Sequence, residues 1–458
     1  MKKGTEKLTK RMMAALAAGL LFGIAMIALR ETLKGNGHEA IWNVLNKVLF
    51  ADISAEGNEH AIGLLYIIGQ LFVRSLQLVI VPMVFTSIVL AMIRIKDASK
   101  LGRISRRTIG YFLLTTVIAI LLASTVGMGA YNAGLFNQSA TAAIDSTQGT
   151  EAANPLMIII NAVPNNLASA FTNNGGVLAI VVVAVMCGLA VNKLRDKVTA
   201  LPKLCEEVSD IITVVLTFIV NRLGPVAIFC LISRTCASYG ISYLKPAMAY
   251  VLLTVALLLI VLLFGYGLFV RITTGVKASV FQKRIAKVAL FGFSTSSSAA
   301  TLPLNMKTAT EELGVPSEIA SFVLPLGMTV NMDGTAVMQV IATLFIAGVS
   351  GYHITMPTLI LIGLLAIVAS VGTPAAPGAG AVILFTILSG VGINNDMALM
   401  TYSLILAINR PIEMLVTSLN VVSDTACAMA VAKNENCLDT ESLMDTEQMP
   451  AAQTHEPK

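Results

Sequence analysis

Long apolar runs separated by short polar segments make up most of this chain. Each of the first six runs is long enough to cross a bilayer as a helix, which takes about 20 apolar residues. These six runs cover residues 12–29, about 62–93, about 109–131, about 176–192, about 208–232 and about 247–270. We therefore expect a polytopic helical membrane protein, with a bend in the second span at Pro82.

In the last third of the chain, short apolar stretches alternate with segments of small and polar residues. An apolar arm, 288–293, leads into the serine-rich segment 294–303. A second arm, 359–369, leads into the small-residue segment 370–380 and returns through 381–389. Neither stretch is long enough to span twice, so both are read as re-entrant hairpins, one from each side. Each precedes a full span that carries polar residues in its middle, the pattern of two inverted repeats meeting at a central site.

Basic residues are confined to a few loops. They cluster in residues 2–11, 94–107 and 193–203, whereas 132–175 contains no Lys or Arg. By the positive-inside rule both termini are expected in the cytoplasm, and 30–60 and 132–175 outside. The polar tail after Lys433 is expected to be disordered. An uncleaved first helix and this topology suggest a bacterial inner (plasma) membrane.

Composition supports the membrane class and excludes several functions. Of 458 residues, 56% are hydrophobic and 12% charged, against about 25% charged in soluble domains. The confined basic residues do not predict nucleic-acid binding. The four His residues lie outside the apolar spans, so Ser296–Ser298 lacks the neighbour that would activate a nucleophile. A membrane enzyme is therefore disfavoured, and a channel is disfavoured because no filter-like motif or arginine-rich sensor helix occurs.

Polar residues lie in the segment Leu324–Thr335, which is the middle of the seventh span. A carboxylate such as that of Asp333 costs at least ~2.5–3.5 kcal/mol at bilayer depth, which marks it as functional. Gly327 and Gly334 suggest local unwinding, which frees backbone carbonyls beside the oxygens of Asn331 and Asp333. An oxygen-only cage of this kind predicts a site for a hard cation.

The eighth span, 409–424, places five polar side chains at intervals of three and four residues. They share one helical face, which must therefore point into the protein. These residues are Arg410, Glu413, Thr417, Asn420 and Asp424.

Four motifs in this order resemble the glutamate-transporter homologues, the dicarboxylate/amino acid:cation symporters. They are the serine-rich tip, Asn331–Thr335, Gly372–Gly380 and Asn420–Asp424, and the resemblance extends to Lys433. It implies an all-α homotrimer in lipid, with eight spans, two re-entrant hairpins and inverted repeats. An elevator-type transport domain would comprise 109–131 (helix 3) and 247–432 (helix 6, hairpin 1, helix 7, hairpin 2 and helix 8). The scaffold would comprise 1–108 with helices 1 and 2, and 132–246 with an extracellular loop and helices 4 and 5. Residues 433–458 would form the tail.

The resemblance also implies ligands, with Na⁺ as the coupling ion, protons left open and no cofactor. One sodium site would use Gly327, Asn331, Asn420 and Asp424. A second would use Thr329, Met332, Ser370, Val371 and Thr373. A third would use Thr115, Thr116, Asn331 and Asp333. Substrate would contact Ser297, Ser298, Thr335, Pro374, Ala375, Glu413, Val416, Thr417 and Asn420.

Two positions depart from the pattern of acidic-substrate members. Glu413 stands where they have Asp, and Val416 stands where they have the Arg that holds the substrate's side-chain carboxylate. Val cannot replace that bidentate contact, so a small neutral amino acid is the expected substrate, with its amine at Glu413. Arg410 is expected to snorkel to the outer interface. If it turns inward instead, a dicarboxylate or acidic amino acid, coupled to sodium or protons, becomes the alternative.

Overall fold

The computed structural model describes residues 2–53, 58–94, 101–137, 163–172, 177–194, 197–239, 244–371, 373 and 378–439. Within these residues every regular element is helical and no β-strand occurs. The first half contains α1 (Lys2–Gly35), α2 (Glu39–Leu49), α3 (Leu64–Leu78), α4 (Ile80–Arg94), α5 (Leu101–Asn132), α7 (Leu167–Thr172), α8 (Val177–Leu194), α9 (Ala200–Phe218) and α10 (Gly224–Tyr239).

The second half contains shorter helices that come in pairs. They are α11 (Leu244–Ile260), α12 (Tyr266–Thr274), α13 (Ala278–Thr295), α14 (Ser298–Glu311), α15 (Ser317–Val330), α16 (Asp333–Val349), α17 (Met356–Val371), α18 (Ala379–Val391), α19 (Asp396–Ile408) and α20 (Arg410–Asn434). One π-helical turn, Ile219–Leu223, joins α9 to α10, and another, Val261–Gly265, joins α11 to α12.

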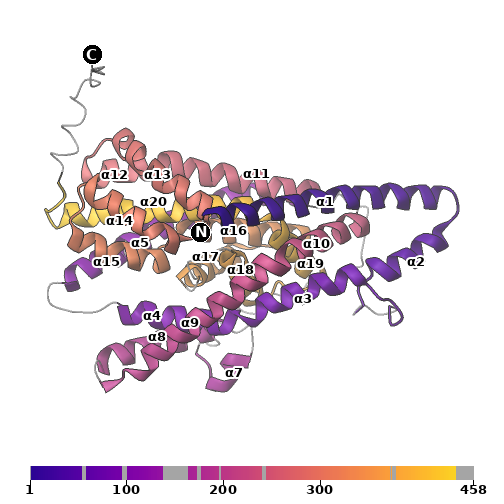
Figure 1. Ribbon diagram of the computed structural model, residues 1–458, viewed down its shortest axis with the longest axis horizontal. Helices are drawn as coiled ribbons and strands as arrows, with labels where there is room; N and C mark the ends of the chain where they lie inside the picture. Colours follow the sequence, from indigo (N-terminus) through magenta and orange to yellow (C-terminus); the bar gives the residue numbers. More distant parts are fainter. Residues whose placement is uncertain are drawn as a thin grey trace, which may run out of the picture.

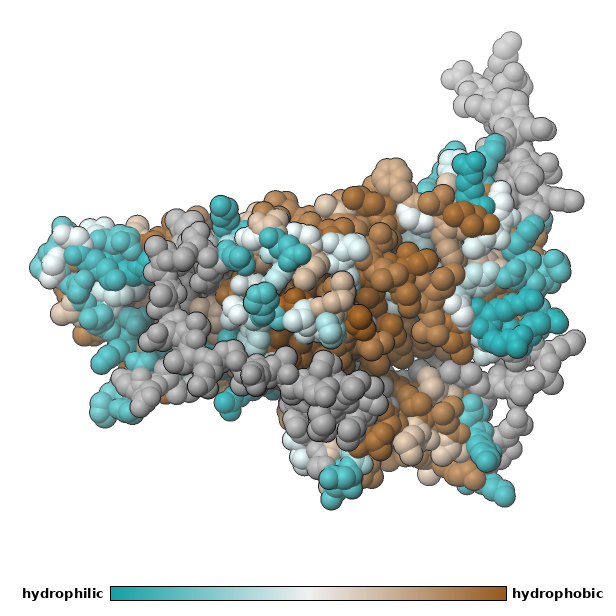
Figure 2. Space-filling model, turned by 180° about the vertical axis from the view of Figure 1, so that it is seen from behind, coloured by the Kyte–Doolittle hydropathy of each residue, from teal (hydrophilic) through white to brown (hydrophobic). Residues whose placement is uncertain are grey.

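Seven helical stretches of the described chain are long and apolar enough to cross a membrane. They are Ala14–Gly35, Leu64–Leu90, Arg103–Asn132, Ala200–Ala237, Lys245–Thr274, Ser317–Val349 and Arg410–Asn434. Shorter apolar helices lie at Val182–Leu194, Met356–Val371, Ala379–Val391 and Asp396–Ile408. The surface is brown and apolar in the middle of the long axis and hydrophilic toward both ends (Figure 2). This banding fits a molecule whose long axis crosses a bilayer.

The second span is interrupted near its proline, as expected, but one turn earlier. α3 ends at Leu78 and α4 begins at Ile80, so the break lies at Val79. A proline ring clashes with the carbonyl four residues before it, which for Pro82 is that of Leu78. The interruption therefore falls where the proline excludes regular helix.

The helices pack in two groups (Figure 1). In the first group, α1 and α3 pack on α10, while α8 and α9 pack on α4. In the second group, α16 and α20 lie at the centre. One or both of them are packed by α5, by the helices from α11 to α15 and by those from α17 to α19. The groups touch mainly where α10 meets α19, with smaller contacts of α1 on α13 and α4 on α15.

The second group contains the core of the molecule. Every residue of α16 except Gly348 is buried, and most of α20 is buried as well. In the first group α9 exposes large apolar side chains, among them Ile211, Val214 and Phe218. Polar residues on α16 and α20 therefore lie inside protein, whereas α9 presents a surface suited to lipid or another apolar partner.

Two helix pairs lie in the stretches for which re-entrant hairpins are predicted. α13 and α14 pack together and are joined by only Ser296 and Ser297. α17 and α18 also pack together, and residues 372 and 374–377 between them lie outside the described residues.

The first residues of the expected tail belong to the helical body. α20 continues through Asn434, and the backbone N–H of Asp439 donates to the carbonyl of Gly314 at 3.0 Å. Residues 433–439 are thus attached to the helical body, and 440–458 lie outside the described residues.

Candidate functional site

The break between α15 and α16 organises the site. Asn331 and Met332 leave helical geometry, with φ/ψ of −100°/79° and −114°/59°. α16 restarts at Asp333, and the first turn of a helix leaves backbone N–H groups without helical partners. One of them, that of Gly334, donates to Asn420 Oδ1 at 2.8 Å. The sequence prediction of a locally unwound seventh span is confirmed.

Asp333 is fully buried and accepts hydrogen bonds from three hydroxyl groups. Thr116 of α5 donates to Oδ1 at 2.5 Å. Tyr266 of α12 and Ser423 of α20 each donate to Oδ2 at 2.6 Å. Four helices therefore converge on one carboxylate.

Asn331 links this carboxylate to a second one. Its amide nitrogen donates to Ser423 Oγ at 2.8 Å and to Asp424 Oδ1 at 3.0 Å. Its amide oxygen accepts from Thr115 Oγ1 at 3.2 Å. The structure thus assembles Thr115, Thr116, Asn331, Asp333 and Asp424, which the family resemblance assigned to two sodium sites.

Two glycines permit this close packing. A Cβ at Gly327 would lie 2.5 Å from Asp424 Oδ1 and 3.1 Å from Phe112 Cζ. A Cβ at Gly334 would lie 2.9 Å from the Val416 carbonyl oxygen. Asp424 consequently reaches the backbone of α15 at Gly327, where a larger residue would displace its carboxylate.

The charge of this cluster is unbalanced. Asp333 and Asp424 are 0% and 2% exposed, and neither forms an ion pair with a Lys, Arg or His of the described chain. A buried uncompensated carboxylate costs several kcal/mol, so a cation fits between them. In the described residues no three His, Cys, Asp or Glu side chains gather as they do around transition metals. Hydroxyl, amide and carboxylate oxygens are instead the donors that hard cations prefer.

The proposed second sodium set is less compact. Thr329 Oγ1 donates to the Leu326 carbonyl, Ser370 Oγ to that of Ile367 and Thr373 Oγ1 to that of Ala369. Met332 Sδ accepts from Thr335 Oγ1 at 3.8 Å. α15 and α17, which carry the two halves of the set with Val371, pack against each other. The structure brings the two helices together. Each of the three hydroxyl groups, however, donates to a backbone carbonyl three or four residues earlier in the chain.

The predicted substrate residues border this cluster. Asn420 Nδ2 donates to Thr335 Oγ1 at 3.2 Å, and Thr417 Oγ1 donates to the Glu413 carbonyl at 3.0 Å. Ser297 caps α14, because its Oγ accepts from the backbone N–H of Ala300, and Ser298 is buried in the first turn of that helix. Pro374 and Ala375 lie outside the described residues.

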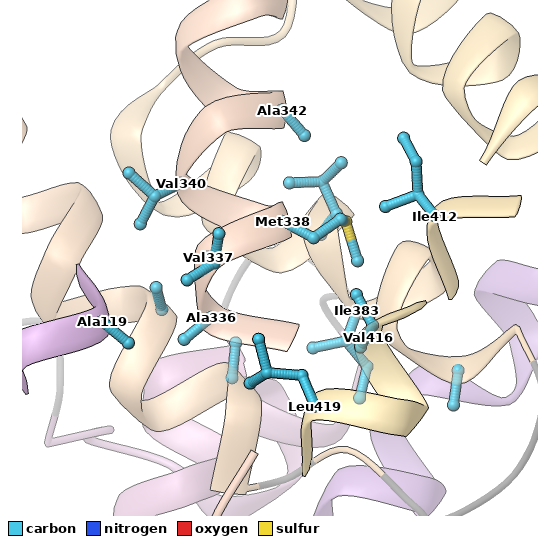
Figure 3. Close-up of a cluster of buried hydrophobic side chains, with 14 of the residues drawn as sticks. Ala119, Ala336, Val337, Met338, Val340, Ala342, Ile383, Ile412, Val416 and Leu419 are labelled. Atoms are coloured by element: carbon cyan, nitrogen blue, oxygen red, sulfur yellow. The ribbon is translucent and has the colours of Figure 1, made fainter. Parts of the chain in front are cut away.

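Val416 lies in an apolar environment. Figure 3 shows its side chain beside Ile383 of α18, with Met338 of α16 nearby. Val416 is 6% exposed and belongs to the main hydrophobic core. The prediction that no substrate carboxylate is held at this position stays a prediction, and the side chain offers apolar surface there.

The prediction that Arg410 snorkels is wrong. Its side chain is 5% exposed, and Nη1 lies 3.7 Å from Glu413 Oε2. Nε, Nη1 and Nη2 are all buried and make no hydrogen bond within the described structure. α19 precedes Arg410 and packs on α10 and α16, so Arg410 begins only the second half of a longer helical path.

Sequence reasoning missed several side chains of the site. Tyr266 and Ser423 complete the hydrogen bonds of Asp333. Asn305 of α14 donates to the Val421 carbonyl at 2.9 Å and accepts from Thr425, which attaches the first helix pair to α20. Ser423 could have been found from its spacing of three from Asn420, whereas a lone Tyr266 in an apolar span gives no comparable signal.

The sequence of this chain is similar to those of known membrane transporters. The model of the sodium:dicarboxylate symporter family matches residues 8–434. The proton/glutamate-aspartate symporter of Escherichia coli K12 is 30% identical over 389 residues, covering 82% of this chain and 86% of that protein. The proton/sodium-glutamate symport protein of Bacillus caldotenax is 28% identical and covers 83% and 90%. A C4-dicarboxylate transport protein of Anaeromyxobacter sp. (strain K) is 28% identical and covers 81% and 84%.

Proposed function

Because the chain belongs to the sodium:dicarboxylate symporter family, we propose that it is a sodium-coupled symporter importing a small substrate that carries a carboxylate. The chain is a transporter and not an enzyme, and it is a multi-pass bacterial membrane protein. The observation that carries the proposal is the oxygen-only cluster of Asp333, Asp424 and Asn331. It buries two carboxylates that pair with no cationic side chain of the described residues.

Sodium is favoured over protons by the donor set. Seven side chains contribute hydroxyl, amide or carboxylate oxygens from five helices or their junctions: Thr115, Thr116, Tyr266, Asn331, Asp333, Ser423 and Asp424. A proton would need one acceptor, whereas a hard cation needs several oxygens converging on one point. Proton coupling is the second candidate, because two of the relatives are named as proton symporters.

Alternating access would use the two helix groups. We propose that α5 and the helices from α11 to α20 form the transport domain, and that α1–α4 and α8–α10 form a scaffold that trimerises in lipid. The elevator motion would then occur where α10 meets α19 and where α4 meets α15. The basic loops support cytoplasmic termini, and no cofactor is included in this scheme.

Two classes of substrate are supported by different residues. Val416 supports a small neutral amino acid, because its apolar packing offers nothing to a second carboxylate. Arg410 supports an acidic amino acid or a dicarboxylate, because its guanidinium is buried beside Glu413. The names of the three relatives agree with the second class.

Uptake into proteoliposomes tests the coupling ion and the substrate together. Serine, alanine, cystine, aspartate and succinate would each be offered with an inward sodium gradient or an inward proton gradient. We expect accumulation of at least one substrate with sodium alone, abolished in Asp424→Asn. Accumulation driven by the proton gradient in sodium-free buffer would overturn sodium coupling. Failure to accumulate any carboxylate substrate would overturn the transport proposal.

A further inference from the structure

The π-helical turn Val261–Gly265, between α11 and α12, comes directly before a side chain of the Asp333–Asp424 cluster. At its end the backbone N–H of Tyr266 donates to the Val261 carbonyl, five residues earlier. Single π turns of this kind are rare and accommodate one additional residue in a helix. One additional residue rotates everything after it by about 100° about the helix axis. The turn therefore determines which way Tyr266 faces.

Tyr266 faces the buried carboxylate of Asp333. Its side chain is 4% exposed, and its hydroxyl donates to Asp333 Oδ2 at 2.6 Å. In a regular helix the same side chain would point about 100° away from this direction. The π turn and α12 both pack on α20, which carries Ser423, the other donor to Oδ2. The hydrogen bond from Tyr266 to the cluster thus depends on the π turn.

A glutamine of the next helix holds this turn from the side. Gln282 of α13 is half-buried, and its Nε2 donates to the Leu262 carbonyl, inside the π turn, at 3.0 Å. α12 and α13 pack against each other along this contact. Because the bond forms only when the Leu262 carbonyl faces α13, it stabilises the backbone of the π turn in that orientation.

A glycine gives the glutamine room to reach the turn. A Cβ at Gly267 would lie 3.1 Å from Ala278 Cβ and 3.3 Å from Gln282 Nε2. Both distances are shorter than ordinary van der Waals contact between carbon and its neighbours. A larger residue at position 267 would therefore compete with the amide of Gln282 for the same space. The close approach of α13 to α12 is built into both helices.

We propose that Gln282 is a positioning residue for the coupling cation: its hydrogen bond to the Leu262 carbonyl holds the π turn in the register that places the Tyr266 hydroxyl in the cluster. The proposal rests on the proposed sodium symport and adds to it a residue that contacts neither carboxylate of the cluster. It also links α13, whose far end leads to Ser297, to the cation cluster through α12.

A positioning role differs from a purely structural one in how the effect is transmitted. A structural hydrogen bond would stabilise the packing of α12 on α13 whether or not Tyr266 carries a hydroxyl. A positioning bond affects sodium only through that hydroxyl. Removal of the hydroxyl should then abolish the effect of Gln282 on sodium affinity, which a double-mutant cycle measures.

The cycle uses the full-length protein and sodium itself as the probe. Thermal stabilisation by NaCl, against choline chloride at equal ionic strength, would be titrated for wild type, Gln282→Leu, Tyr266→Phe and the double variant. Gln282→Leu should raise the half-saturating sodium concentration by about 3- to 10-fold, at or below the lower end for residues that support an ion ligand. The double variant should match Tyr266→Phe within about 2-fold. Gln77→Leu, half-buried on α3 in the other helix group, is the matched control and should bind sodium as wild type does.

A second variant reaches the same bond from α12. Gly267→Ala leaves Gln282 in place and crowds its amide, so it should weaken sodium binding in the same direction. Its effect should likewise disappear when Tyr266 is already Phe. This variant carries the test if Gln282→Leu does not fold.

The outcomes separate this inference from the proposed function. Wild-type sodium affinity in both Gln282→Leu and Gly267→Ala overturns the role of Gln282 while sodium binding stands. Losses that multiply in the double variant also overturn it, because the effect would then bypass Tyr266. A wild type that NaCl stabilises no more than choline chloride overturns both sodium coupling and the role of Gln282.

Discussion

α20 carries two charged sites that differ in how their charges are satisfied. Near its middle, Asp424 shares hydrogen bonds with Asn331 opposite Asp333, and this site has hydrogen bonds but no counter-charge from the described residues. Near its start, Arg410 faces Glu413, and this pair has a counter-charge, while the guanidinium has no hydrogen bonds. The two sites lie about three to four helical turns apart on one helix.

The two sites differ in what their buried groups lack. Hydrogen bonds fix the oxygens of the first site in place, and the cation of the proposed symport scheme would balance the negative charge that remains. At the second site the two charges balance each other, whereas the guanidinium nitrogens of Arg410 are buried without hydrogen-bond partners in the described structure. The first site thus lacks counter-charge, and the second lacks hydrogen bonds.

The largest effect is expected for Asp424→Asn. The substitution keeps the shape of the side chain but removes one of two charges that a cation balances. We expect kcat/KM for sodium-driven uptake to fall by more than about 100-fold. Asp396→Asn, at the exposed start of α19, is the matched control and should transport normally. Uptake in Asp424→Asn that still responds to sodium as in wild type would contradict the assignment.

A smaller loss is expected for Gly327→Ala. The added Cβ would lie 2.5 Å from Asp424 Oδ1, so the carboxylate must shift away from its position between α15 and α20. We expect the sodium concentration for half-maximal uptake to rise by up to about 100-fold. Gly129→Ala on α5 meets no atom within 4 Å and is the control. Equal sodium dependence of the two variants would show that Asp424 is not a ligand at this place.

Tyr266→Phe should weaken sodium binding, but less than Gly327→Ala does. The ring remains, and only the hydroxyl that donates to Asp333 Oδ2 is lost. Because one of three donors disappears, sodium affinity should change by about 10-fold, the lower end for residues that support an ion ligand. Tyr131→Phe removes a hydroxyl bonded to the Tyr352 carbonyl, remote from the cluster. It should leave sodium dependence unchanged, and a matching change there would point to a general loss of stability.

Much of the Asp333–Asp424 cluster could be predicted from the sequence because its oxygen-bearing side chains interrupt apolar runs. Asn331 and Asp333 stand out in a span that should be apolar, and Asp424 falls on a polar helical face. Their partners were less predictable. Tyr266 meets Asp333 across 67 residues and Ser423 across 90, so only the packing of α12 and α16 on α20 reveals these contacts.

Arg410 shows why local context was insufficient for the second site. A lone arginine near a helix start is ordinarily free to reach the membrane surface. Here α19 comes before it and packs on α16, so the same residue is enclosed. The apolar run of α19 and the polar face of α20 belong to one path, and no glycines flank its break at Asn409 as Gly327 and Gly334 flank the break between α15 and α16.

The smallest effect is expected where charges are both paired and hydrogen-bonded. Glu435, just past α20, accepts from Arg103 at 3.0 Å and from Arg107 at 2.7 Å. This third site lacks neither counter-charge nor hydrogen bonds, so it should bind nothing. Glu435→Gln should lower stability by about 1 kcal/mol, since both arginines remain partly exposed to water. Thermal unfolding would detect this loss, while uptake should keep the wild-type KM for sodium and substrate. A change in either KM would mean that satisfied and unsatisfied buried charges cannot be told apart by function, which would weaken the assignment of a cation to the Asp333–Asp424 cluster.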